Sequence, residues 1–203
     1  MYLTFDTTDY EERWFKITPD HSGAYRYCSY AIDLFKELSK GCSNFVETGT
    51  GPGGGLFHAF KVGFENYYSV DIDSKFYNDC MYVFEEYDNV YLAQGESYDA
   101  LEIWLKDIDS KCMFWLDAHP NNPDETSLPN KILFAELEVI KKHPYKEHSI
   151  LIDNVPEYFS NSIEQIKEKL LEINPNYTVG LKTGAEGRSN YVLCAYIGES
   201  DEN

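Results

Sequence analysis

Short apolar segments alternate with longer segments of helical periodicity along most of this 203-residue chain. Each expected strand is followed by apolar residues at the three- to four-residue spacing of a helix. Right-handed crossovers connect such units, so the pattern predicts an α/β fold with a doubly wound, mainly parallel sheet. The five expected strands are residues 44–48, 67–71, 90–93, 112–116 and 149–152.

Both ends of the chain depart from this alternation. Segments 177–182 and 191–197 flank the turn-rich sequence TGAEGRSN, which predicts an antiparallel hairpin and brings the sheet to seven strands. Residues 1–20 are polar and aromatic without a clear period, and we expect an N-terminal extension before a single domain over 21–203. Ser74 and Ser97 are expected to cap the helices that begin near them, the first of which extends to Tyr87.

Composition narrows the classes of partner. Seventeen basic residues against thirty-five acidic ones give a net charge of −18, which disfavours binding to nucleic acid. No apolar run is long enough for a membrane helix, so we expect a cytoplasmic location without membrane contact. The five cysteines form no CxxC pair, and we expect reduced thiols.

A glycine cluster, ETGTGPGGG, follows the first strand and opens a helix. Gly49, Gly51 and Gly53 allow a sharp turn and a close approach of ligand to backbone, where the helix directs its N–H groups at an anion or dipole. Asp71 ends the next strand 20 residues after Gly51, where a carboxylate can accept the two hydroxyls of a ribose. Together these features indicate an adenosine-containing cofactor.

The same turn also satisfies the dinucleotide pattern G-x-G-x-x-G, so Glu47 is needed to distinguish the cofactors. Its carboxylate at the strand tip suits a cationic amino group or an ordered water and would repel a pyrophosphate. No tyrosine has a lysine four residues later, as a short-chain dehydrogenase would need. These observations favour S-adenosylmethionine (SAM), although the glycines could form a tight turn and no more.

Polar residues follow the third, fourth and fifth strands as well. Ser97 could form a hydrogen bond with the edge of the adenine base as well as cap a helix. Asp117 follows FWL, and Asp153 and Asn154 follow ILI, 36 residues after Asp117. Adjacent parallel strands would bring these oxygens together as ligands of Mg²⁺, whereas the alternative is that they cap turns or that Asp117 contacts the cofactor's methionine part.

The motifs ETGTGPGGG, VDID, GESYDAL, FWLDAH and ILIDNV, in this order, resemble those of class I SAM-dependent methyltransferases with a Rossmann-like fold over residues 44–197. Asp117 with Asp153 and Asn154 resembles the magnesium site of catechol and caffeoyl-CoA O-methyltransferases, and FWLDAH is also similar to small bacterial and phage methyltransferase-like proteins. The resemblance implies that Glu47, Gly49 and Gly51 hold the methionine end of SAM. It implies Asp71 for the ribose and Ser97 for the adenine.

One position departs from the catechol enzymes, which have a general-base lysine where this chain has Pro120. His119 is the nearest residue that could take a hydroxyl proton, although a lone histidine after a strand can also be structural. We expect methyl transfer from SAM to an oxygen of a small acceptor, with Asp117 and His119 as catalytic residues and Mg²⁺ as a second cofactor. Loop 121–129 and the N-terminal segment are candidates for closing the site, or ordinary solvated loops.

Two other classes of function remain open. Asp71 and Asp73 could form the paired-carboxylate metal site of a nucleotide-sugar glycosyltransferase. A non-catalytic module that keeps the cofactor fold and binds a partner protein is the other possibility.

Overall fold

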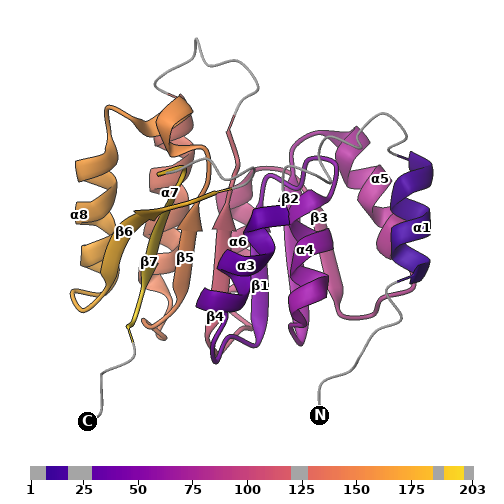
Figure 1. Ribbon diagram of the computed structural model, residues 1–203, viewed down its shortest axis with the longest axis horizontal. Helices are drawn as coiled ribbons and strands as arrows, with labels where there is room; N and C mark the ends of the chain where they lie inside the picture. The colour runs from indigo at the N-terminus through magenta and orange to yellow at the C-terminus, as the bar shows by residue number, and fades with distance from the viewer. Residues whose placement is uncertain (1–7, 18–28, 120–127, 185–189, 199–203) are drawn as a thin grey trace.

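A computed structural model describes residues 8–17, 29–119, 128–184 and 190–198. Its centre is one seven-stranded sheet with the order β3-β2-β1-β4-β5-β7-β6, in which β7 runs antiparallel to the other six strands (Figure 1). This order reverses direction at β1, which lies between β2 and β4. The strands are β1 (Asn44–Thr48), β2 (Asn66–Asp71), β3 (Val90–Gln94), β4 (Cys112–Leu116), β5 (Ser149–Ile152), β6 (Thr178–Lys182) and β7 (Val192–Tyr196).

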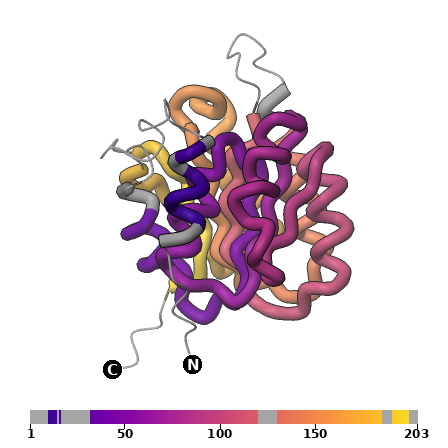
Figure 2. Tube along the Cα trace, turned by 90° about the vertical axis from the view of Figure 1, so that its right-hand side faces the viewer, coloured from indigo at the N-terminus to yellow at the C-terminus, as the bar shows by residue number. Residues whose placement is uncertain are grey.

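Helices cover both faces of the sheet (Figures 1 and 2). One face packs against α1 (Thr8–Ile17), α3 (Ser29–Leu38), α4 (Gly54–Val62) and α5 (Ser74–Phe84). The other face packs against α6 (Ser97–Trp104), α7 (Leu128–Lys142), the short π-helix η1 (Val155–Phe159) and α8 (Ile163–Ile173). Alternation along the strands supplies both cores: Phe45 and Met113 point to the first face, and Val46 and Phe114 to the second.

The predicted strands, their parallel order and the C-terminal hairpin are confirmed, and β1, β4 and β5 are buried along their whole length. Three predicted helix boundaries are wrong. Asp73, not Ser74, caps α5 by accepting a hydrogen bond from Lys75 N, and α5 ends at Phe84, before Tyr87. Glu96 precedes α6 at the cap position, so Ser97 is the first residue of that helix.

The N-terminal segment contains a helix that the sequence did not predict. Helix α1 lies alongside α5 (Figure 1), and Tyr10 and Trp14 are fully buried in the first core. Arg13 forms ion pairs with Glu85 and Glu86, which follow α5. Aromatic burial thus fixes α1 to the same face of the sheet as α4 and α5.

Within the described ranges, no helix is both long and apolar enough to cross a membrane. Cys42, Cys80, Cys112 and Cys194 are free thiols, as expected, and Cys28 lies outside the described residues. Burial raises the pKa of the Cys42 thiol. Such thiols are packing residues rather than nucleophiles.

Candidate functional site at the carboxyl ends of the parallel strands

The glycine turn after β1 passes very close to the tip of β4. Gly49 has a φ of +80°, and a Cβ there would lie 2.4 Å from the carbonyl oxygen of Asp117, so no other residue fits. The turn is tied to β2, because Gly49 N and Thr50 N both donate to Val70 O, at 2.9 and 3.1 Å. At Gly51, in contrast, a Cβ would meet nothing within 4 Å, so the turn leaves open space above it for a ligand.

Glu47 lies beneath this turn and is 1% exposed. Its Oε2 accepts a 2.6 Å hydrogen bond from Ser69 Oγ, which lies 2.7 Å from Thr50 Oγ1. Burial raises the pKa of Glu47 well above its usual value, and the charges of Asp117 and Asp71 raise it further. A cationic group bound beside it would offset that penalty and favour the carboxylate.

Asp71 ends β2 beside the turn, as predicted. Its Oδ2 accepts a 2.7 Å hydrogen bond from Gly51 N, and its Oδ1 accepts one of 2.8 Å from Asp73 N. These bonds fix the orientation of the carboxylate, and each oxygen keeps lone pairs for further donors. Asp71 is half-buried, so both oxygens stay within reach of a ligand at the turn.

The third glycine contacts α1 and α5. Gly53 has a φ of +85°, and a Cβ there would lie 3.0 Å from Cys80 Sγ and 3.5 Å from Trp14 Nε1. Trp14 Nε1 donates a 2.6 Å hydrogen bond to Pro52 O. The N-terminal helix therefore supports the turn at Pro52 and Gly53.

The tips of β4 and β5 meet next to the turn, as the parallel order predicts. Asp117 N donates to Thr48 O at 3.0 Å, and Asp153 N donates to Leu116 O at 3.1 Å. Asn154 follows in the left-handed conformation, with a φ of 55°. This turn directs its side chain back toward Asp117.

The amide of Asn154 joins the predicted site residues into one cluster. Its Nδ2 lies 2.8 Å from Asp117 Oδ1, 3.0 Å from His119 Nε2 and 3.5 Å from Asp153 Oδ2. His119 Nε2 is also 3.0 Å from Asp117 Oδ1, and its ring stacks on Tyr158 with centroids 3.8 Å apart. Three of these residues were predicted as metal ligands and two as catalytic residues, and all four lie together.

Tyr191 also belongs to this cluster, although no pattern in the sequence indicates it. Its Oη lies 2.6 Å from Asn154 Oδ1 and 2.8 Å from Glu157 Oε1. A hydroxyl has one proton, and donation to the Glu157 carboxylate is the stronger, charge-assisted bond. Rotating the Asn154 amide by 180° would then let its NH₂ group donate to Tyr191, with its oxygen facing Asp117.

The orientation of the Asn154 amide decides whether these residues fit a cation. With nitrogen toward Asp117 the amide satisfies the carboxylates itself, whereas with oxygen toward Asp117 a positive charge is needed between them. Two carboxylates and an amide oxygen match the preference of Mg²⁺ for oxygen ligands. Among the residues that the structure describes, no group of three or more His, Cys, Asp and Glu side chains could hold a metal ion, so the fit depends on Asn154.

Ser97 lies at the start of α6, beside the tip of β3, and is 6% exposed. Its hydroxyl has no hydrogen-bond partner among the described residues. Residues 120–127, which include Pro120 and most of the predicted closing loop with Asp124 and Glu125, lie outside the described residues.

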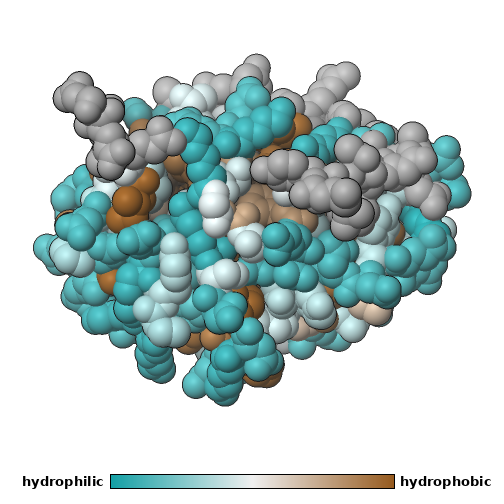
Figure 3. Space-filling model, turned by 90° about the horizontal axis from the view of Figure 1, so that it is seen from below, coloured by the Kyte–Doolittle hydropathy of each residue, from teal (hydrophilic) through white to brown (hydrophobic). Residues whose placement is uncertain are grey.

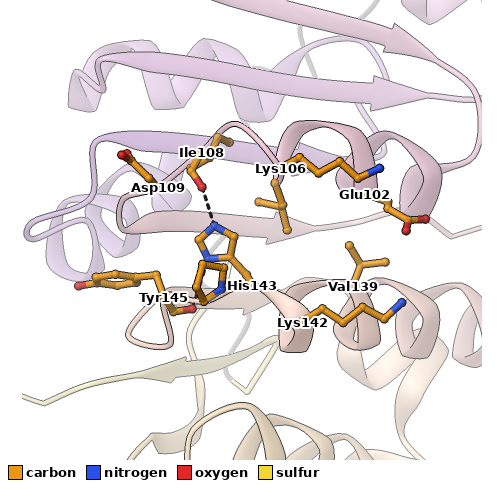
Figure 4. Close-up of a pocket in the computed structure, with 10 residues that line it drawn as sticks. Glu102, Lys106, Ile108, Asp109, Val139, Lys142, His143 and Tyr145 are labelled. Carbon is orange, nitrogen blue, oxygen red and sulfur yellow. Dashed lines mark hydrogen bonds between the residues drawn. The ribbon is translucent and has the colours of Figure 1, made fainter.

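A hollow of about 630 Å³ lies at the opposite end of the sheet from these strand tips, between the ends of α6 and α7 (Figure 4). There His143 Nε2 lies 2.7 Å from Ile108 O, and His143 Nδ1 lies 3.1 Å from His148 Nε2. Both ring nitrogens of His143 are therefore engaged within the protein. The molecule seen from below is mostly hydrophilic, with scattered apolar side chains (Figure 3). Ligands of open α/β sheets bind at the carboxyl ends of the strands, so we place the candidate site there.

Solved structures share this architecture. An O-methyltransferase from Bacillus cereus in complex with S-adenosylhomocysteine (SAH) superposes with a TM-score of 0.60, covering 96% of this chain and 93% of that one at 16% identity. An SAH-bound methyltransferase from Podospora anserina has a TM-score of 0.56, with 96% and 88% coverage and 15% identity. The chain has the fold of these methyltransferases.

Solved structures of proteins other than O-methyltransferases share this fold. The fibrillarin pre-rRNA processing protein of Methanococcus jannaschii has a TM-score of 0.55, covers 87% of this chain and 76% of its own, and is 14% identical. No protein-family model matches the sequence, and no curated protein matches it. The acceptor must therefore be argued from the site.

Proposed function

We propose that this protein transfers the methyl group of SAM to an oxygen of a small acceptor. The observation that carries the proposal is the open glycine turn flanked by Glu47 and Asp71 in a methyltransferase fold. The net charge of −18 favours a small molecule over a nucleic acid as the acceptor.

In this proposal, the turn residues Gly49, Gly51 and Gly53 surround the methionine end of SAM. Glu47 accepts from the cofactor's cationic amino group, which explains a carboxylate in so buried a position. Asp71 accepts the ribose hydroxyls with the lone pairs left by its backbone bonds. Ser97 bonds the adenine, and Asp117 lies beside the methionine end.

His119 takes the proton of the acceptor hydroxyl, and Asp117 Oδ1, 3.0 Å from Nε2, stabilises the imidazolium that forms. The acceptor oxygen then forms a bond to the methyl carbon as the carbon–sulfur bond breaks, and its electron pair stays on sulfur. Alignment of the two reactants can supply roughly 7 to 11 kcal/mol of the barrier reduction. Tyr158, stacked on His119, holds the imidazole plane in place.

Asp117, Asp153 and Asn154 are the residues that would hold Mg²⁺ beside His119. When bound there, the ion would lower the pKa of an acceptor hydroxyl. The alternative of a glycosyltransferase with paired carboxylates has less support, because Asp73 Oδ1 is occupied by the Lys75 backbone as a helix cap.

Calorimetric titration with SAH, with and without Mg²⁺, tests cofactor binding, and a panel of catechols, phenols and sugars with methyl-labelled SAM tests turnover. We expect micromolar SAH affinity and label on a hydroxylated acceptor. Binding of a UDP-sugar with Mn²⁺ and not of SAM would favour the glycosyltransferase. SAM binding without product across the panel would favour the non-catalytic module.

A further inference from the structure

Tyr191 is held beside the strand tips by its own backbone. It directly precedes β7, is 7% exposed, and its N–H donates to Lys182 O at 3.0 Å. Its carbonyl oxygen accepts a 3.1 Å hydrogen bond from Val155 N, in the residue after Asn154. The hydroxyl of Tyr191 therefore has a fixed place next to the Asn154 amide.

Three short contacts link Glu157 to Asp117 through Tyr191 and Asn154. Glu157 Oε1 lies 2.8 Å from Tyr191 Oη, which lies 2.6 Å from one terminal atom of the Asn154 amide. The other terminal atom of that amide lies 2.8 Å from Asp117 Oδ1. Polar atoms at these distances need a hydrogen between them, or a positive charge beside them.

These three contacts have one hydrogen too few. The Tyr191 hydroxyl supplies one, and the NH₂ group of Asn154 faces only one of its two neighbours. With the NH₂ group toward Asp117, the hydroxyl donates to the Asn154 oxygen, and the contact between Tyr191 and Glu157 lacks a hydrogen. With the NH₂ group toward Tyr191, the hydroxyl donates to Glu157, and the contact between Asn154 and Asp117 lacks one. The two orientations therefore differ in which end of the chain of contacts is incomplete.

A cation beside Asp117 supplies what the second orientation lacks. The amide oxygen of Asn154 would then face the ion together with Asp117 and Asp153. His119 Nε2, 3.0 Å from the same amide atom, can donate to that oxygen. At the other end, the hydroxyl bond to the Glu157 carboxylate is charge-assisted, and such bonds are about twice as strong as neutral ones. Both ends of the chain then favour the same orientation.

We propose that Tyr191 and Glu157 are positioning residues that turn the amide oxygen of Asn154 toward the cation site. This inference rests on the proposed function, in which Asn154 is one of the residues that hold Mg²⁺. Tyr191 accepts from the amide NH₂ group and donates to Glu157, so the acidic residue selects the orientation through the hydroxyl. Partners that orient metal ligands in this way contribute roughly 10- to 100-fold to metal affinity.

The test measures the dissociation constant of Mn²⁺, a paramagnetic substitute for Mg²⁺, by electron paramagnetic resonance on the full-length protein with SAH present. Tyr191→Phe removes only the hydroxyl and should weaken Mn²⁺ binding by roughly tenfold or more. Its calorimetric affinity for SAH should stay near the wild-type value. Tyr91→Phe is the matched control, because it removes a hydroxyl from β3, at the far edge of the sheet, and should change neither constant.

Glu157→Gln should weaken Mn²⁺ binding as well, because the Tyr191 hydroxyl then loses its charged acceptor. Removal of a negative charge near the ion would also lower the affinity, and the double variant separates the two causes. If Glu157 acts through Tyr191, the loss in the double variant should be smaller than the product of the two single losses. A loss equal to that product would overturn the role of Glu157.

Asn154→Asp removes the need for orientation, because either oxygen of a carboxylate can bind an ion. In this background Tyr191→Phe should weaken Mn²⁺ binding much less than it does in the wild type. Equal losses in the two backgrounds would overturn the inference, because the hydroxyl would then act by packing or polarity and not through the amide.

An unchanged Mn²⁺ affinity in Tyr191→Phe would also overturn the inference. If that variant does not fold, Glu157→Gln still decides, because Glu157 is exposed and an unchanged affinity there has the same meaning. A wild-type protein that binds SAH but not Mn²⁺ would overturn this inference and the metal site, and would leave methyl transfer from SAM standing. Failure to bind SAH would instead overturn the proposed function itself.

Discussion

A Cβ atom on Gly55 would lie 1.8 Å from Glu47 Oε1. The carboxylate of Glu47 therefore occupies the space that a side chain at the start of α4 would take. The amino terminus of a helix favours a negative charge, which partly compensates the burial of Glu47. Glycine at this position keeps the acidic group directly under the turn.

Gly55→Ala should weaken SAH binding by roughly tenfold or more, since Glu47 must move and one charge-assisted hydrogen bond is worth about 1.5 to 3 kcal/mol. Alanine is a better helix former than glycine, so helix propensity itself does not predict a loss. Gly180→Ala is the control, because a Cβ there meets nothing within 4 Å. Equal calorimetric affinities for the two variants would contradict the role of Glu47.

Asp71→Asn should reduce SAM affinity roughly 10- to 100-fold, because an amide has one acceptor oxygen where the carboxylate has two and carries no charge. Asp73→Asn, which keeps an oxygen for Lys75 N, should leave the affinity near the wild-type value. If both variants lose nucleotide binding equally, the paired-carboxylate alternative gains support. Isothermal titration of the two proteins side by side gives the answer.

Asp153→Asn should abolish any stimulation of turnover by Mg²⁺ while leaving SAH affinity within about twofold of the wild type. The reason is that Asp153 lies beside Asn154 at the tip of β5, and β4 separates this strand from β1 and the glycine turn that follows it. Full activity of the wild-type protein in excess EDTA would exclude the ion from the reaction.

His148 should make the protein less stable as the pH falls. Burial lowers the pKa of His148 to about 3, and the charges of His143 and Lys146 act in the same direction. The unfolded chain binds a proton as the pH falls through about 6.5, whereas the folded chain does not. Between pH 7.5 and 5 this difference costs about 2 kcal/mol of unfolding free energy.

His148→Asn can keep an acceptor for Cys112 N, which donates to His148 Nδ1 at 3.1 Å in the wild type. The variant is expected to be less stable but to lose about 2 kcal/mol less over the same pH interval. Urea unfolding at several pH values measures both slopes. Parallel curves for the two proteins would show that His148 does not titrate as its burial requires.

The sheet was predictable because its strands are short apolar runs whose order follows from right-handed crossovers. The tips of β4 and β5 could be placed together for the same reason. Helix α1 was missed because the charged run at 11–13 hides the spacing of Tyr10 and Trp14, whose partners are distant in sequence. The cap at Glu96 was missed because serine is the commoner residue there.

The burial of Glu136, a carboxyl residue in α7 that is 1% exposed, had a signal in the sequence that was not used. It lies on the buried face of its helix with Leu133, Leu137 and Ile140, where a charge is unexpected. The sequence contains no such signal for Tyr191, because its position beside Asn154 depends on how the last strand pairs within the sheet.

The indole of Trp14 holds the carbonyl of Pro52, so a helix near the start of the chain braces the bend that would receive the cofactor. Variation on the outer surface of α1, or in its ion pairs with the residues after α5, could loosen this brace without touching any ligand. Substitutions in α1 can therefore change the affinity for the cofactor, although these residues do not line the site that would bind it.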